Sequence, residues 1–144
     1  MTDDVPQALS STVQHRVPFY ETDAMGVVHH ANYLLYLEEA RTAYMASFGF
    51  PYGRLEQEGI GLPVRSCELR FRAPAHYEDE LLVRARLTAL RGASMTFSYE
   101  IERAGTLLLE AVVELACVDL AARPRRPRLL PDHLASQVRE LLEP

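Results

Sequence analysis

Residues 31–48 constrain the fold more than any other part of the chain, because they form a helical stretch that is apolar on almost every side. Apolar side chains recur there at the three- or four-residue spacing of a helix, as in Tyr33, Leu37, Ala40 and Tyr44. The main polar sector contains only Glu38, Glu39 and Arg41. Gly49 and Pro51 end the pattern. A helix with so much apolar surface is expected to be largely buried, and a sheet wrapped around it would bury it.

The rest of the chain predicts mainly extended strands. Alternating or mostly apolar runs occupy residues 12–20, 62–72, 80–91, 94–103 and 107–120. Pro18 places the first strand at an edge or a bulge, and a slip of the alternation near Ser66 predicts a bulge in the second. Because the last three strands are joined by short turns, the sheet is expected to be antiparallel.

One α+β domain spanning residues 1–144 follows from this order of elements, with a long central helix wrapped by a curved antiparallel sheet. Residues 1–11 are polar and contain a proline, and they are expected to form a flexible arm. Residues 54–58 predict a short helical piece. Residues 131–143 predict a C-terminal amphipathic helix capped by Asp132.

Composition and motif content exclude several classes of function. Twenty acidic residues against fifteen basic ones give a net charge of −5, which argues against a general nucleic-acid-binding surface. Cys67 and Cys117 are expected to be small buried hydrophobes rather than a disulfide or zinc ligands. The five histidines lack the spacing of a metal site, and we expect no cofactor. With no signal peptide and no apolar run of about 18 residues, the predicted location is cytoplasmic.

Residues 21–29 contain the candidate chemistry. Asp23 lies in a tight polar turn that leads directly into the start of the long helix, where backbone N–H groups are unpaired and carry partial positive charge. A carboxylate base or nucleophile beside such donors provides the two parts that acyl transfer needs. The structural alternative is that Asp23 only caps its own turn, which is the commoner role of such a residue.

Four blocks of sequence resemble hotdog-fold acyl-CoA thioesterases of the 4-hydroxybenzoyl-CoA thioesterase family, and in particular the small bacterial branch often encoded beside the Tol–Pal envelope genes. The blocks are TDAMGVVHHANYLLYLEEAR (22–41), RFRAPAHYEDEL (70–81), LRGASMTFSYEI (90–101) and ELACVDLAARPRRP (114–127). The resemblance covers roughly residues 16–131 and implies a hotdog fold, an acyl-CoA substrate and a homodimer that often pairs again into a homotetramer.

The same resemblance assigns roles to individual residues. It implies that Asp23 is the catalytic carboxylate, acting as general base on water or as a nucleophile that forms a mixed anhydride. It implies that the backbone N–H of His30 polarises the thioester carbonyl, while its side chain can bond substrate or Asp23. The residues expected to bind substrate are Gly26, Val27, His29, Asn32, Val64, Arg65, Arg91, Gly92 and Ser94. In contrast, Glu21 is expected to be exposed to solvent.

The basic cluster formed by Arg123, Arg125, Arg126 and Arg128 is either simply solvated or able to steer an anionic CoA ester. Two alternatives to a thioesterase stay open. One is a hotdog hydratase or dehydratase for enoyl thioesters, although the block around Asp23 does not match its acid–base patterns. The other is a non-catalytic module that binds acyl-CoA or a protein. The choice of acyl group depends on pocket depth and on side chains such as Phe48, Leu62 and Val64.

Overall fold

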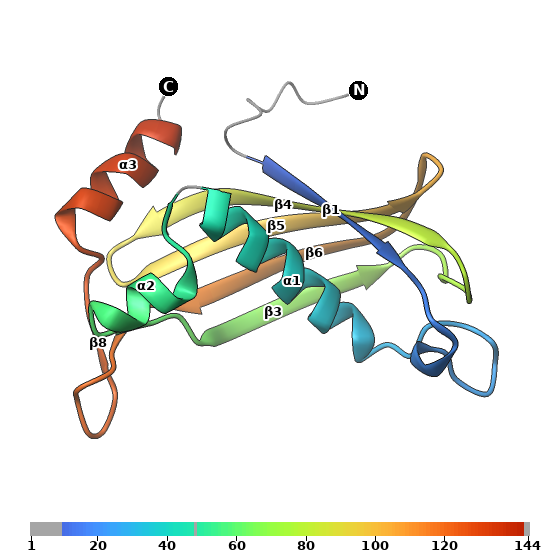
Figure 1. The fold of residues 1–144 in the computed structure, drawn as a ribbon, viewed down its shortest axis with the longest axis horizontal. Helices are drawn as coiled ribbons and strands as arrows, with labels where there is room; N and C mark the ends of the chain where they lie inside the picture. The colour runs from blue at the N-terminus through green and yellow to red at the C-terminus, as the bar shows by residue number, and fades with distance from the viewer. Residues whose placement is uncertain (1–9, 48, 143–144) are drawn as a thin grey trace.

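The computed structural model describes residues 10–47 and 49–142. Five strands form one antiparallel sheet in the order β1-β4-β5-β6-β3, and helix α1 (Asn32–Ser47) lies across one face of it (Figure 1). The strands are β1 (Ser10–Arg16), β3 (Val64–Phe71), β4 (Glu80–Arg91), β5 (Ser94–Arg103) and β6 (Thr106–Ala116). The predicted α+β architecture, with a long helix against an antiparallel sheet, is confirmed.

Shorter elements surround this frame. A second sheet contains β2 (Ile60–Gly61), β7 (Val118–Asp119) and β8 (Arg126–Pro127). The helical pieces are the 3-10 turn η2 (Phe19–Glu21), α2 (Tyr52–Gln57) and α3 (Asp132–Leu142). The predicted strand 107–120 is therefore broken at Cys117, where the chain leaves the large sheet and joins the small one. Among the described residues, no helix is long and apolar enough to cross a membrane.

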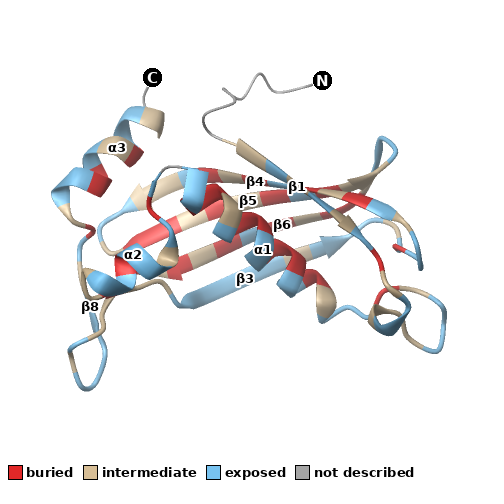
Figure 2. Cartoon of the chain, viewed as in Figure 1, coloured by how far each residue is buried: buried red, intermediate tan, exposed pale blue. Residues whose placement is uncertain are grey.

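The core lies between α1 and the concave face of the sheet (Figure 2). Alternate residues of β4, Leu81, Val83, Ala85 and Leu87, are almost completely buried, as a half-buried strand requires. Tyr44 of α1 packs edge-on against Phe97 of β5, with ring centroids 5.2 Å apart. The expected burial of α1 holds only for the side facing the sheet. Leu34 and Leu35 remain 44% and 59% exposed, because the sheet covers the helix from one side.

Several predicted boundaries were wrong. The first strand ends at Arg16 rather than at residue 20, because Pro18 immediately precedes the 3-10 turn. Ser10 and Ser11 belong to β1, so the predicted arm 1–11 was wrong for these two residues. Residues 1–9 and Phe48 lie outside the described residues. Asp132 was predicted to cap the C-terminal helix, but it is the first residue of α3. The residue before the helix is Pro131, whose carbonyl accepts the N–H groups of Leu134 and Ala135.

Strand β3 confirms one prediction and corrects another. The register shifts between Val64 and Ser66, which is the predicted bulge. Cys117 is buried as expected, but Cys67 is exposed. The reason is the position of β3 at the edge of the sheet, where almost every residue of the strand faces solvent.

Strand register defines two opposite ends of the large sheet. At one end Arg16 pairs with Glu80 and Arg103 pairs with Thr106. We call this the loop end, because the segment that contains Asp23 follows β1 there (Figure 1). At the other end, the hairpin end, Ser94 pairs with both Arg91 and Ala116.

Candidate active site

Residues 21–29 fold into a small hairpin of their own at the loop end. Thr22 and Val28 form an isolated antiparallel bridge, and the backbone N–H of Asp23 donates to the carbonyl of Val27 at 2.9 Å. Gly26 closes the turn with φ = +79°, a conformation that L side chains rarely adopt, and its N–H donates to the carbonyl of Asp23.

Asp23 lies at the centre of this hairpin, and its two carboxylate oxygens have different surroundings. Oδ1 accepts hydrogen bonds from the backbone N–H groups of Met25 at 2.8 Å and Val27 at 3.4 Å. The capping interpretation is thus correct for this oxygen. Oδ2 has no hydrogen-bond partner within residues 10–47 and 49–142, and the residue is half-buried. One oxygen orients the carboxylate while the other is left for chemistry.

The chain enters α1 through His29, His30 and Ala31. The N–H of Ala31 donates to Nδ1 of His29 at 3.2 Å, and the N–H of Asn32 donates to the carbonyl of His29 at 2.9 Å. In the part of the chain that the structure describes, the N–H of His30 donates to no protein acceptor. It is therefore an available donor at the positive end of the helix.

The side chains of His29 and His30 stack on each other, with ring centroids 4.3 Å apart and planes inclined by 26°. Both residues precede the first residue of α1, so helical geometry does not turn their side chains apart. Neither imidazole is hydrogen-bonded to Asp23 among the described residues. No group of three or more potential metal ligands occurs within those residues either.

A turn at residues 74–79 supports the hairpin from outside. The carbonyl of Ala75 accepts the N–H of Val28 at 2.8 Å, and Val27 forms a bridge with His76. Asp79 holds this turn through its Oδ2, which accepts the N–H of His76 at 2.8 Å and Nη1 of Arg103 at 2.7 Å. Burial raises the pKa of Asp79, but these two hydrogen bonds outweigh it and hold the pKa below its usual value.

Glu21 was expected to be exposed to solvent, and this expectation was wrong. Its side chain is only 13% accessible. Its Oε1 accepts the hydroxyl of Tyr36 at 2.5 Å and lies 2.8 Å from Nε2 of His15. Its carbonyl accepts Nδ2 of Asn32 at 2.8 Å, which joins the loop to the first residue of α1. Sequence reasoning missed this cluster because its three side chains come from different elements and share no motif.

The remaining predicted substrate-binding residues lie away from Asp23. Arg91 and Gly92 form the exposed turn at the hairpin end, and the hydroxyl of Ser94 donates to the carbonyl of Arg91 at 2.9 Å. Val64 is exposed at the start of β3, and Arg65 is paired with Glu114 of β6. Within one protomer, the structure does not bring these residues together with the hairpin of residues 21–29.

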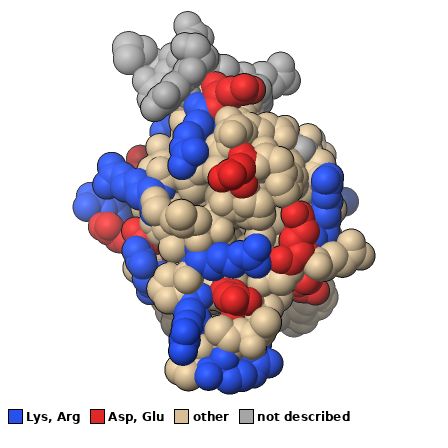
Figure 3. All heavy atoms as spheres, turned by 90° about the vertical axis from the view of Figure 1, so that its left-hand side faces the viewer, with Lys and Arg blue, Asp and Glu red and all other residues tan. Residues whose placement is uncertain are grey.

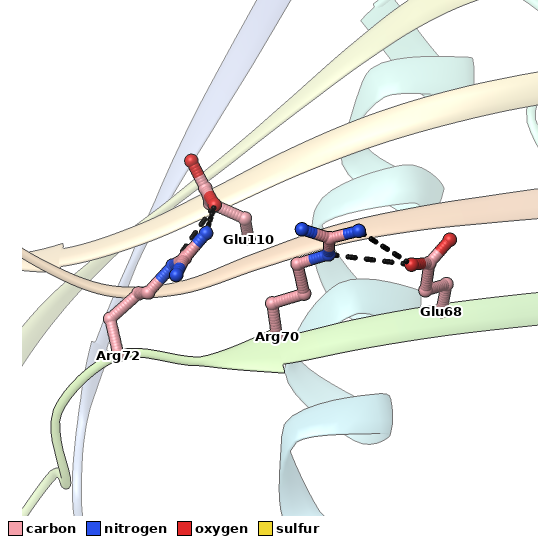
Figure 4. Close-up of polar contacts among 4 residues, drawn as sticks. All are labelled: Glu68, Arg70, Arg72 and Glu110. Atoms are coloured by element: carbon pink, nitrogen blue, oxygen red, sulfur yellow. Dashed lines mark hydrogen bonds and ion pairs between the residues drawn. The ribbon is translucent and has the colours of Figure 1, made fainter.

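All fifteen basic residues are arginines, and their partners differ between regions of the molecule. On the face of the sheet away from α1, Arg72 pairs with Glu110 at 2.8 Å and Arg70 with Glu68 at 3.3 Å (Figure 4). These guanidinium groups are already neutralised by carboxylates.

The arginines of the β7–β8 loop, at the hairpin end, bond to the backbone rather than to carboxylates. Arg123 and Arg125 donate to the backbone carbonyl of Leu120, and neither of them nor Arg126 pairs with a carboxylate among the described residues. Figure 3 shows this end of the molecule, with arginine side chains in blue over its lower part. These three arginines therefore place positive charge without a carboxylate partner opposite the loop end.

Comparison with known proteins gives consistent matches over most of the chain. Residues 17–138 match the family model of the thioesterase-like superfamily. The chain is 36% identical over 126 residues to acyl-CoA thioester hydrolase YbgC of Escherichia coli, covering 87% of this chain and 92% of that relative.

Two solved structures show the same arrangement of elements. A hypothetical protein from Thermus thermophilus superposes with a TM-score of 0.84 at 36% identity, covering 92% of this chain and 98% of the other. An aspartate-to-asparagine mutant of 4-hydroxybenzoyl CoA thioesterase, complexed with 4-hydroxybenzoyl CoA, superposes with a TM-score of 0.82 at 25% identity. That alignment covers 93% of this chain and 99% of the other.

Proposed function

Because this chain belongs to the thioesterase-like superfamily, has its hotdog fold and is a thioester hydrolase, we propose that it hydrolyses acyl-CoA to a free carboxylic acid and CoA with Asp23 as the reacting carboxylate. Two features of the segment that leads into α1 carry the assignment. Among the described residues, neither Oδ2 of Asp23 nor the backbone N–H of His30 has a hydrogen-bond partner. The mutant captured with its CoA substrate supports an aspartate in this role.

In the proposed reaction, the thioester carbonyl oxygen accepts the N–H of His30, which stabilises the negative charge that develops on it. The Oδ2 oxygen of Asp23 then takes a proton from water as the water attacks the carbonyl carbon. Alternatively, Oδ2 attacks that carbon itself, and water hydrolyses the resulting mixed anhydride. In both routes the carbon–sulfur bond breaks, and the CoA sulfur leaves and takes up a proton.

The exposed edge of β3 supports a homodimer. An edge strand of eight residues with free backbone groups is a ready template for another strand, and Val64 and Phe71 on it are 52% and 54% exposed. A two-fold axis through this edge would pair two copies of β3 antiparallel in one continuous sheet. The exposed Leu34 and Leu35 of α1 offer a surface on which two dimers would pair into a tetramer.

This pairing would complete the site. Strand β3 runs from the hairpin end, where Val64 pairs with Leu115, toward the loop end, where Phe71 pairs with Leu109. In an antiparallel dimer, the hairpin end of one protomer therefore meets the loop end of its partner. The Arg91–Ser94 turn and the unpaired Arg123 and Arg125 would then lie on the side of the pocket where the CoA phosphates must be held.

The test is release of CoA, followed with a thiol reagent, from short, long and aromatic acyl-CoAs. Asp23→Asn should lower kcat by about 100-fold or more, because it removes the base but keeps the size of the side chain. Asp119→Asn is a matched control, since Oδ1 of Asp119 caps the N–H of Ala121 at 2.9 Å in the same kind of turn; its kcat should stay near wild type.

Three outcomes would contradict parts of the proposal. Full activity of Asp23→Asn would leave the reaction correct and the residue wrong. An equal loss in Asp119→Asn would mean that turn geometry alone explains the effect. No CoA release from any thioester by a folded dimer would favour a binding module or an enoyl-thioester hydratase.

A further inference from the structure

The carboxylate and the carbonyl of Glu21, two residues before Asp23, accept four hydrogen bonds. The carboxylate oxygen Oε1 accepts the hydroxyl of Tyr36 and lies within hydrogen-bond distance of Nε2 of His15. The carbonyl of the same residue accepts the N–H of His29 at 2.9 Å and Nδ2 of Asn32 at 2.8 Å. One residue thus contacts β1, the far strand of the small hairpin and α1.

These contacts decide where the Asp23 hairpin lies relative to α1. The hairpin leaves the body of the protein at Glu21 and returns at His29, and the carbonyl of Glu21 joins those two points directly. The Glu21 side chain then ties this junction to Tyr36 on the first turns of α1, the same helix whose start presents the N–H of His30. The relative position of the carboxylate and the oxyanion donor therefore depends on this junction.

The chemistry of the cluster suits a fixed anchor. Tyr36 is only 2% exposed, and its ring packs against His15 with centroids 4.3 Å apart. Burial raises the pKa of the Tyr36 phenol, and the hydrogen bond to Glu21 and its negative charge raise it further. The phenol therefore stays protonated and donates to Glu21. No arginine pairs with Glu21 among the described residues, so its partners hold it by directed hydrogen bonds.

We propose that Glu21 is a positioning residue for thioester hydrolysis, which fixes the Asp23 hairpin against the start of α1 through Tyr36 and His15. The inference rests on the proposed function of Asp23 but concerns a different residue. Errors of about 1 Å in the placement of a reacting group can cost about 100-fold in rate, so a loosened anchor should affect catalysis without contact to substrate.

Two pairs of matched variants test this. Tyr36→Phe removes one buried hydroxyl from the cluster, and Tyr99→Phe removes one from the core, where it accepts Nη1 of Arg41 at 3.0 Å. We expect Tyr36→Phe to lower kcat about 10-fold with KM within about twofold, whereas Tyr99→Phe keeps kcat despite a comparable loss of Tm. Glu21→Gln should lower kcat by a similar factor, and Glu110→Gln on the exposed face should not.

A double-mutant cycle distinguishes positioning from general damage. If Glu21 acts through Asp23, Glu21→Gln should cost less than about twofold once Asp23→Asn is present. An undiminished loss in that background, or unchanged kcat in both Tyr36→Phe and Glu21→Gln, would overturn the proposal. If Tyr36→Phe does not fold, His15→Gln replaces it, because His15 lies on the surface side of the cluster. The same changes in kcat and KM are expected for this variant.

Amide hydrogen exchange tests the anchor without reference to activity. Glu21→Gln should speed exchange of the N–H groups of Val27, Val28 and His29 about 10-fold and leave those of β5 and β6 unchanged. This result would stand even if Asp23→Asn proved fully active, which would refute the proposed catalytic residue alone. Unchanged exchange in the hairpin would refute the anchor itself.

Discussion

The two ends of the sheet hold complementary parts of the candidate chemistry. At the loop end, Glu21, Asp23 and Asp79 are held by backbone groups, by histidine and tyrosine side chains and by Arg103. At the hairpin end, Arg123 and Arg125 lack carboxylate partners among the described residues. An acyl-CoA has a reactive thioester at one end and phosphates at the other. In the proposed function, one protomer would provide for both halves of such a substrate, but at opposite ends of its own sheet.

The largest loss of activity is expected from dissociating the proposed dimer, because the two ends that bind the halves of the substrate would then no longer meet. Cys67→Glu places a charge in the middle of the exposed β3 edge, and in an antiparallel dimer the two new carboxylates would lie near the two-fold axis. We expect monomers in light scattering and a loss of about 100-fold or more in kcat/KM, because the site would be incomplete.

The control for this change lies on the opposite edge of the same sheet. Thr12 is exposed on β1, and Thr12→Glu adds the same charge at the edge that the proposed dimer leaves free. Its oligomeric state and activity should match wild type. A fully active Cys67→Glu monomer would show that one protomer is sufficient. It would contradict the inference that the loop end of one protomer and the hairpin end of its partner form one site.

A smaller effect is expected from changing only the cationic half. Replacing Arg123 and Arg125 together with alanine should raise KM about 10-fold with little change in kcat, because charged hydrogen bonds to phosphate would be lost before the chemical step. The KM of this variant should also depend less on salt concentration than that of wild type. Arg84→Ala, which loses an exposed pair with Glu100 away from the β3 edge, is the control.

Mixed dimers would show whether the two halves come from different protomers. In a dimer of one Asp23→Asn protomer and one protomer lacking Arg123 and Arg125, one of the two sites regains both wild-type parts if the halves act across the dimer. A random equal mixture should then recover roughly a quarter of wild-type kcat/KM. If each site is built within one protomer, mixing would recover nothing beyond the average of the two parents.

The smallest effect is expected on the free energy of unfolding, from changing Asp79, which holds the turn at residues 74–79 beside the loop end. Because the pKa of Asp79 is lower in the folded protein than its usual 3.8, its ion pair stabilises the fold above that pH and loses its contribution as the pH falls through the folded pKa. Asp79→Asn should therefore lower the free energy of unfolding at pH 7 by no more than about 1 kcal/mol. Below pH 4 the difference should shrink, as measured by urea unfolding; a difference that persists there would contradict the linkage.

Local pattern was enough to predict the frame of the fold. The spacing of Tyr33, Leu37 and Tyr44 predicts α1, and alternation predicts β4 with its buried Val83. Even the bulge near Ser66 is visible, because a slipped alternation is a local signal. The Asp23 turn was similarly accessible from its Asp and Gly residues.

What could not be predicted depends on distant parts of the chain. Glu21 is covered by His15 and Tyr36, six and fifteen residues away in the sequence, and no periodicity links them. Cys67 looks like any apolar strand residue until the sheet order places β3 at the edge. The stacking of His29 on His30 depends on where α1 begins, which sequence patterns locate only to within a few residues.

The exclusive use of arginine has a consequence for durability. Lysine amines that lose their proton are nucleophiles, and they attack reactive thioesters to give stable amides. A guanidinium keeps its proton at any pH that the protein meets, so it can hold phosphate without ever competing for the acyl group. With fifteen arginines and no lysine, this chain offers an activated acyl donor no side-chain amine. Such a surface can meet a thioester repeatedly without forming a stable amide on a lysine side chain.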